Sequence, residues 1–122
     1  MLILLGWAVS SCGQTPKDNS KLSDAYARKE LNLALSDKKI HNVVNSKAFI
    51  IKNKETAIKV VEPILFQIYG QDNILKQRPY ETYLINNYWI ISGRLSEGYD
   101  GGTFLVIVDA TNSKVIRLTH GK

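Results

Sequence analysis

A chain of 122 residues with 44% hydrophobic and 22% charged side chains has the composition of one globular domain, which argues against disorder. Its net charge of +5 comes from scattered lysines without interleaved aromatic residues, so no nucleic-acid groove is predicted. The single cysteine, Cys12, excludes an internal disulfide, and His41 and His120 offer no zinc-ligand spacing. We therefore expect a fold that needs no disulfide, metal or cofactor.

The first segment in chain order is an apolar run, residues 2–9, which is too short to cross a bilayer and is followed by two serines and Cys12. The stretch from Val9 to Cys12 resembles the lipobox of bacterial lipoproteins, in which a peptidase cuts before the cysteine and lipid is attached to it. The resemblance implies a signal peptide over residues 1–11, lipidation at Cys12, a polar tether over residues 12–20, and an exported lipoprotein anchored to the membrane and facing the periplasm. The alternative is that residues 2–9 form a buried first strand, with Cys12 as a small core residue.

The rest of the chain, residues 21–122, is expected to fold as a single α+β domain. Helix formers fill residues 21–36, with a thin apolar stripe, and predict the first helix. Residues 37–47 are mostly polar and indicate a connection. The short apolar piece at residues 48–51 is interpreted as a strand that leads into the next helix.

The strongest helix pattern begins after Asn53, a good N-cap candidate because its side chain can accept from the free amides of the first turn. Pro63 lies inside this pattern and predicts a bend, and Gly70 stands where a left-handed C-terminal cap is expected. The apolar positions that recur at helical spacing are Ala57, Val60, Val61, Ile64, Leu65 and Ile68.

One more helical turn is expected over residues 71–77, and the Arg78-Pro79 step ends it. Aromatic and β-branched residues then predict antiparallel strands in meander order, the third of them central and covered on both faces. The expected strands are residues 80–85, 88–95, 103–109 and 114–120, with Asn86-Asn87 as a hairpin turn between the first two. The expected architecture is a set of N-terminal helices packed on a curved four-stranded antiparallel sheet.

The glycine-rich stretch GYDGGTF, from Gly98 onward, permits three interpretations. Phosphate binding is disfavoured, because the stretch joins two strands and does not lead into a helix N-terminus. An acid/base site would use Tyr99, Asp100 and the distant His120, but no spacing forces these groups together. We favour a structural turn, in which Gly98, Gly101 and Gly102 adopt backbone angles that a side chain would strain.

Aromatic residues cluster on the first two predicted strands, and cross-strand packing is their default role. Adjacent strand residues face opposite ways, so some of these rings must lie outside the core. Exposed Tyr and Arg side chains dominate protein-binding hot spots. The partner-binding hypothesis therefore names Tyr80, Tyr83, Arg94 and Tyr99.

Three pieces in a fixed order carry a family resemblance: AIKVVEPILFQIYG, RPYETYLINNYWIISGRLSEGYDGGTF and LVIVDATNSKVIRLTHGK. Residues 56–122 resemble the nuclear transport factor 2 fold immunity proteins of bacterial polymorphic toxin systems. Asn112-Ser113 departs from the family, where a glycine-containing turn is more usual.

The resemblance implies a nuclear transport factor 2-like or cystatin-like cone and a non-catalytic protein that binds and neutralises a cognate protein toxin. Two alternatives stay open. One is a small enzyme or ligand-binding domain that uses the pocket of the cone. The other is an exported inhibitory domain, because the ending of the chain also resembles PepSY-like domains.

Overall fold

The computed structural model describes residues 20–98 and 100–122. The chain divides into two compact units, one ending at His41 and the other running from Asn42 to Lys122, and each is described by itself. The first unit contains helix α1, Ser20–Ser36, and this confirms the first predicted helix. The signal peptide, Cys12 and nearly all of the tether that the sequence predicts lie outside the described residues.

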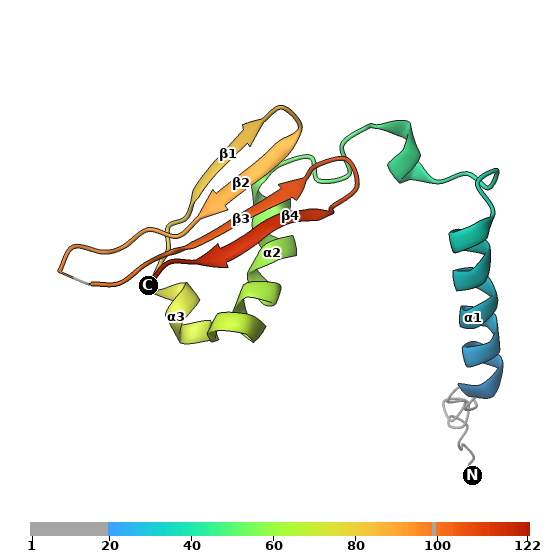
Figure 1. The fold of residues 1–122 in the computed structure, drawn as a ribbon, viewed down its shortest axis with the longest axis horizontal. Helices are drawn as coiled ribbons and strands as arrows, with labels where there is room; N and C mark the ends of the chain where they lie inside the picture. Colours follow the sequence, from blue (N-terminus) through green and yellow to red (C-terminus); the bar gives the residue numbers. More distant parts are fainter. Residues whose placement is uncertain (1–19, 99) are drawn as a thin grey trace, which may run out of the picture. The chain divides into compact units, whose positions relative to one another are not determined.

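The second unit begins with a short 3-10 helix, η2, and two α-helices (Figure 1). Asn53 caps α2 as expected, since its Oδ1 accepts from the Thr56 amide at 2.8 Å. Helix α2 continues through Pro63, so the bend predicted there stays a prediction. Gly70 has the expected positive φ of 92°, but its ψ of 133° is extended and not left-handed helical. With this conformation Gly70 is both the C-cap of α2 and the N-cap of α3, so the two helices follow each other directly. The bounds are Val43–Ser46 for η2, Lys54–Tyr69 for α2 and Gln71–Leu75 for α3.

The strand predicted over residues 48–51 is wrong. The amides of Ile50 and Ile51 both donate to the carbonyl of Ala110, at 2.8 and 3.0 Å. Two successive amides on one carbonyl cannot continue as a strand ladder, in which alternate residues pair. The segment therefore ties the entry of α2 to the end of the third strand of the sheet.

The sheet has four antiparallel strands in the order β1-β2-β3-β4, which confirms the predicted meander and the α+β class. Its strands are β1 Glu81–Ile85, β2 Tyr88–Ser92, β3 Phe104–Asp109 and β4 Val115–His120. Asn86 and Asn87 form the hairpin turn with φ of 47° and 72°, as their tolerance of positive φ predicts. Strand β2 ends at Ser92 and not at residue 95, because the Arg94 amide leaves the sheet and donates to the Gln77 carbonyl at 2.8 Å.

The turn between β3 and β4 is held by Asp109. Its carboxylate accepts from the backbone amide and the hydroxyl of Thr111, at 2.8 and 2.7 Å, and these hydrogen bonds lower the pKa of Asp109. Ser113 takes the positive φ of 62° that a glycine would otherwise supply. The departure from the family at Asn112-Ser113 therefore leaves a regular turn.

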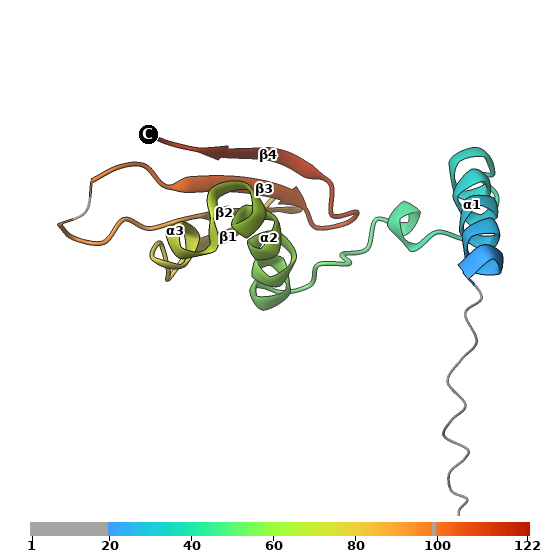
Figure 2. The ribbon, with the colours of Figure 1, turned by 90° about the horizontal axis from the view of Figure 1, so that it is seen from below.

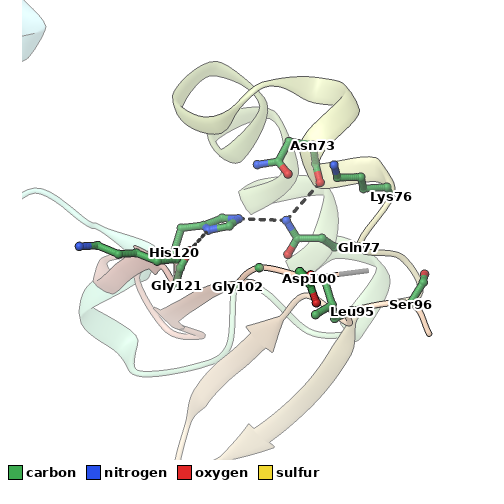
Figure 3. Close-up of a pocket in the computed structure, with 11 residues that line it drawn as sticks. Asn73, Lys76, Gln77, Leu95, Ser96, Asp100, Gly102, His120 and Gly121 are labelled. Carbon is green, nitrogen blue, oxygen red and sulfur yellow. Dashed lines mark hydrogen bonds between the residues drawn. The ribbon is translucent and has the colours of Figure 1, made fainter. Parts of the chain in front are cut away.

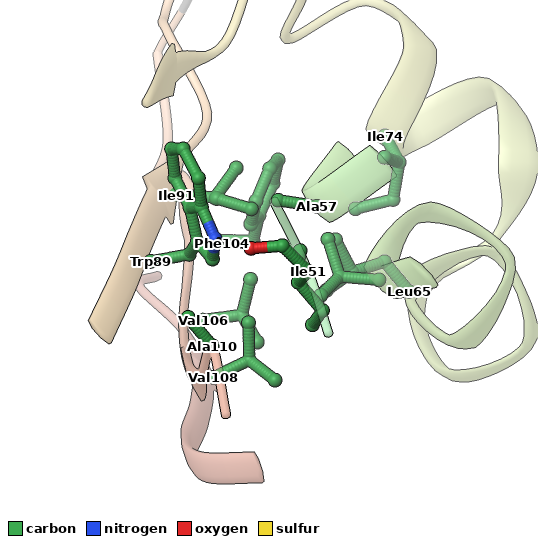
Figure 4. Packing of buried hydrophobic residues seen from close by; sticks show 11 residues of the cluster. Ile51, Ala57, Leu65, Ile74, Trp89, Ile91, Phe104, Val106, Val108 and Ala110 are labelled. Carbon is green, nitrogen blue, oxygen red and sulfur yellow. Dashed lines mark hydrogen bonds between the residues drawn. The ribbon is translucent and has the colours of Figure 1, made fainter. Parts of the chain in front are cut away.

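Helices α2 and α3 lie on one face of the sheet (Figure 2), and the core fills the space between them (Figure 4). Burial alternates along β3, so only one of its faces is fully covered, and the expectation of two covered faces is wrong. Trp89 is 6% exposed, and its indole N–H donates to the Ile51 carbonyl at 2.9 Å. The core residues are Ile51, Ala57, Val61, Leu65, Ile74, Trp89, Ile91, Phe104, Val106, Val108 and Ala110.

Candidate functional site

The face of the sheet opposite α2 and α3 carries a row of apolar side chains, which we call the outer face. Directly paired strand residues share a face, and Tyr83 pairs with Ile90, which pairs in turn with Ile107. Tyr83 is 55% exposed, so this face offers an aromatic ring to solvent. The outer face consists of Tyr83, Ile85, Tyr88, Ile90, Leu105 and Ile107.

An ionic cluster borders this row at the start of β1. The Glu81 carboxylate accepts from the Tyr83 hydroxyl at 2.9 Å and from the guanidinium of Arg94. The two contacts lower the pKa of Glu81, the hydrogen bond from Tyr83 more than that from Arg94. The hydrogen bond to Glu81 in turn raises the pKa of Tyr83. Two of the four residues in the partner-binding hypothesis, Tyr83 and Arg94, are thus brought together on one exposed carboxylate.

Tyr80 occupies a different environment. Its hydroxyl donates to Glu62 on α2, and its ring lies edge-on to the Phe104 ring with centroids 5.1 Å apart. Burial, followed by the hydrogen bond to Glu62, raises the pKa of Tyr80 to about 12. Arg78 also donates two hydrogen bonds to Oε2 of Glu62, from Nε at 3.0 Å and from Nη2 at 2.7 Å. Tyr80 therefore joins β1 to α2 and is not part of the outer face, while Tyr99 lies outside the described residues.

The glycines of the loop before β3 have two different roles. Gly98 and Gly101 have φ of 87° and 112°, which other residues adopt only with strain. The expectation of a strained backbone angle is wrong for Gly102, whose φ is not in the positive range. A Cβ at Gly102 would instead overlap the backbone of Gly121, so the close approach of two chain segments requires this glycine.

A cavity of about 240 Å³ opens between α3, this loop and the end of β4 (Figure 3). It brings Asp100 and His120 to one place, as the acid/base hypothesis requires. Its lining residues are Asn73, Lys76, Gln77, Leu95, Ser96, Asp100, Gly101, Gly102, His120, Gly121 and Lys122.

Gln77 forms the floor of the cavity and is only 2% exposed. Its Oε1 accepts from the backbone amide of Phe104 at 2.9 Å, and this fixes the orientation of the side-chain amide. Its Nε2 therefore faces the Asn73 carbonyl at 3.1 Å and the Nε2 of His120 at 3.0 Å. No periodicity or motif marks Gln77 in the sequence, and for that reason sequence reasoning missed it.

The hydrogen bonds of Gln77 assign the proton of His120. Because the Gln77 amide nitrogen can only donate, His120 Nε2 must accept, and the ring proton lies on Nδ1. This N–H donates to the Gly121 carbonyl at 2.6 Å. Both imidazole nitrogens are thus engaged, so His120 has no nitrogen left to take a proton from a molecule in the cavity.

Within residues 20–98 and 100–122, no group of three or more His, Cys, Asp or Glu side chains could hold a metal ion. No helix in this part of the chain is long and apolar enough to cross a membrane. The candidate sites are therefore the outer face with its ionic cluster, and the cavity above Gln77.

The comparisons with known proteins point to one family. The family model described as NTF2 fold immunity protein matches residues 56–122. A curated relative, the uncharacterized protein YhhH of Escherichia coli (strain K12), is 28% identical over 74 residues, which cover 60% of this chain and 58% of the relative. The chain thus spans less than two thirds of that relative's length, and no solved structure matches it significantly. Because the family model matches more than half of its residues, the chain belongs to the NTF2 fold immunity protein family.

Proposed function

We propose that this protein is a non-catalytic immunity protein that binds a cognate bacterial protein toxin and neutralises it. Membership of an immunity protein family supports the toxin as the partner. The engagement of both His120 nitrogens in hydrogen bonds supports binding over acid/base catalysis by this histidine.

The observation that carries the proposal is the outer face with its ionic cluster. Tyr83, Ile85 and Tyr88 are 55%, 52% and 37% exposed on adjacent strands, so their apolar atoms gain from burial against a partner. A tyrosine ring has few torsions and loses little entropy on docking. Glu81 restrains Tyr83 and Arg94 further, because both donate to its carboxylate before any partner arrives.

Charge adds a preference for an acidic partner. The chain carries a net charge of +5, which speeds association with a negatively charged protein at low salt. Arg117 pairs with Ile107 across β3 and β4 and therefore lies on the same side of the sheet as the apolar row. Arg94 and Arg117 can each form bidentate hydrogen bonds with a carboxylate of the toxin.

The test is binding of the purified protein to a candidate toxin encoded by a neighbouring gene, measured by isothermal titration calorimetry. Tyr83→Ala and Arg94→Ala should each weaken binding by about 1–3 kcal/mol while the circular dichroism spectrum is unchanged. Tyr26→Ala and Arg28→Ala are matched controls, because Tyr26 is exposed on α1 and Arg28 forms an exposed ion pair with Asp24. Equal affinities for all four variants would remove the outer face from the proposal.

We further propose that the protein is exported and anchored to the membrane by lipid on Cys12, and that it faces the periplasm. The support is the sequence alone, an apolar run that ends in Val-Ser-Ser-Cys before a polar segment. Stable anchoring takes more than one acyl chain, which lipoprotein processing supplies. Expressed behind a complete signal sequence, the Cys12→Ser variant should move from the membrane fraction to the soluble fraction. Identical partitioning of the two forms would refute the anchor.

A further inference from the structure

Strand β1 forms one edge of the sheet (Figure 1), and two of its residues turn their backbone groups toward that edge. The Gly93 amide, directly after β2, donates to the Phe104 carbonyl of β3 at 3.0 Å. Because an antiparallel strand bonds alternately to its two neighbours, odd-numbered residues of β2 bond to β3 and even-numbered residues bond to β1. Thr82 and Leu84 pair with odd-numbered residues of β2, so their N–H and C=O groups face away from it. No backbone group among the described residues pairs with them there.

The edge at β1 lacks the features that usually block strand pairing. Natural proteins protect open edges with lysine, proline or a bulge. Strand β1 has the sequence ETYLI and pairs with β2 without a register shift, and its one charged residue, Glu81, forms an ion pair with Arg94. The opposite edge, β4, carries Arg117 and a register shift at Ile107 and Val108. Of the two edges, β1 is therefore the one suited to receive another strand.

Thr82 also has an unmet hydrogen bond at this edge. Among the described residues, its Oγ1 is the one buried side-chain oxygen or nitrogen without a hydrogen-bond partner. Buried hydroxyl groups are nearly always hydrogen-bonded, because an unsatisfied one lowers stability. An added strand would place a side chain opposite Thr82, and Ser or Thr in that position hydrogen-bonds to threonine across a sheet.

A hollow of about 350 Å³ lies at the start of β1. Tyr80 precedes Thr82 by two positions, so a strand that runs beside β1 on this side leads toward the hollow. In partners that bind by strand addition, backbone hydrogen bonds provide affinity and side-chain pockets provide specificity. The residues that line the hollow are Lys54, Ile58, Arg78, Pro79 and Tyr80.

We propose that an extended segment of the toxin adds to β1 as a fifth strand and hydrogen-bonds to Thr82. The inference rests on the proposed function and gives its mode of binding. Tyr83, on the outer face, lies between Thr82 and Leu84 in β1, so one toxin surface can cover the outer face and the edge together. A second copy of this chain fits less well, because two chains of net charge +5 repel each other whereas an acidic partner is attracted.

The test compares two substitutions of Leu84 in binding to a candidate toxin encoded by a neighbouring gene. Leu84→Ala keeps the backbone amide and Leu84→Pro removes it. Because this amide faces the open edge, proline removes no hydrogen bond to β2. Isothermal titration calorimetry should show at least about tenfold weaker binding for Leu84→Pro than for Leu84→Ala, and thermal melts establish that both are folded. Equal affinities of the two variants would overturn the proposal.

Hydrogen exchange followed by NMR tests the same edge without any substitution at Leu84. The amides of Thr82 and Leu84 should exchange at least about tenfold more slowly in the complex, whereas the Tyr83 amide bonds to β2 and is protected in both states. Unchanged exchange of Thr82 and Leu84 in the complex would overturn the proposal. Thr82→Val should melt higher than the wild type and bind the toxin more weakly, and wild-type affinity would contradict the role of the hydroxyl.

The outcomes separate this edge from the immunity role. Toxin binding that is equal for the wild type, Leu84→Ala and Leu84→Pro overturns the edge and leaves the immunity role standing. No binding by the wild-type protein overturns both. Self-association in analytical ultracentrifugation that Leu84→Pro abolishes would assign the edge to a second copy of this chain and overturn the toxin segment as its occupant.

Discussion

Replacing Gln77 by methionine removes the amide from the floor of the cavity while nearly preserving the length of the side chain. The backbone N–H of Phe104, a residue with 0% exposure, then loses the acceptor that lies 2.9 Å away. An unsatisfied buried donor costs about 1–3 kcal/mol, and the lost bond to the Asn73 carbonyl adds about 0.5–1.5 kcal/mol. His120 is partly exposed, so water can replace the donor it loses. We therefore expect a total destabilisation of about 2–4 kcal/mol.

The assay is urea unfolding followed by the fluorescence of the buried Trp89. With a slope of roughly 1–3 kcal/mol per molar urea, the midpoint should fall by about 1–2 M at an unchanged slope. Gln67→Met on the exposed surface of α2 is the matched control and should leave the midpoint unchanged. A midpoint for Gln77→Met equal to that of the wild type would refute the view that this amide holds α3, β3 and β4 together.

Three further predictions concern the loop and the junction between α2 and β1. Gly102→Ala should destabilise the protein by about 1–3 kcal/mol in a thermal melt, because the new methyl group overlaps the backbone of Gly121. The pKa of Tyr80 is raised from 10.0 to about 12, so its neutral hydroxyl stabilises the fold fully below pH 10 and this contribution is lost as the pH approaches 12. In an ultraviolet titration of the tyrosines, the ionisation step at the highest pH should accordingly be absent from the Tyr80→Phe variant. Glu62→Ala should lower the free energy of unfolding by about 1.5–3 kcal/mol, because the hydrogen bonds from Arg78 and Tyr80 to the Glu62 carboxylate are removed. An unchanged midpoint of urea unfolding would contradict this prediction.

Local signals in the sequence predict most of the fold. The N-cap at Asn53 and the hairpin turn at Asn86-Asn87 depend only on neighbouring residues, and both are confirmed. The prediction of a strand over residues 48–51 is wrong because the amides of Ile50 and Ile51 donate to the carbonyl of Ala110, which is distant in sequence. Local apolar character cannot reveal such a partner.

The candidate sites are less accessible to sequence reasoning. Alternation along β1 and β2 predicts that some aromatic rings face away from the core, and Tyr83 does so. Tyr80 and Tyr83 are an odd number of positions apart, so the same alternation puts them on opposite faces of the sheet. The partner-binding hypothesis nevertheless grouped them. The cavity could not be predicted, because it lies beside a hydrogen bond between Gln77 and His120, which are 43 residues apart in the sequence.

The measurement that tests the central claim most directly is growth of bacteria that express a candidate toxin encoded by a neighbouring gene, in the compartment where that toxin acts. Cells that also express this protein should grow as well as cells without the toxin. Cells that express the doubly substituted Tyr83→Ala, Arg94→Ala protein at an equal level should be inhibited, because the double variant lacks both the exposed ring and the restrained guanidinium. Equal inhibition with and without the wild-type protein would contradict the immunity role itself.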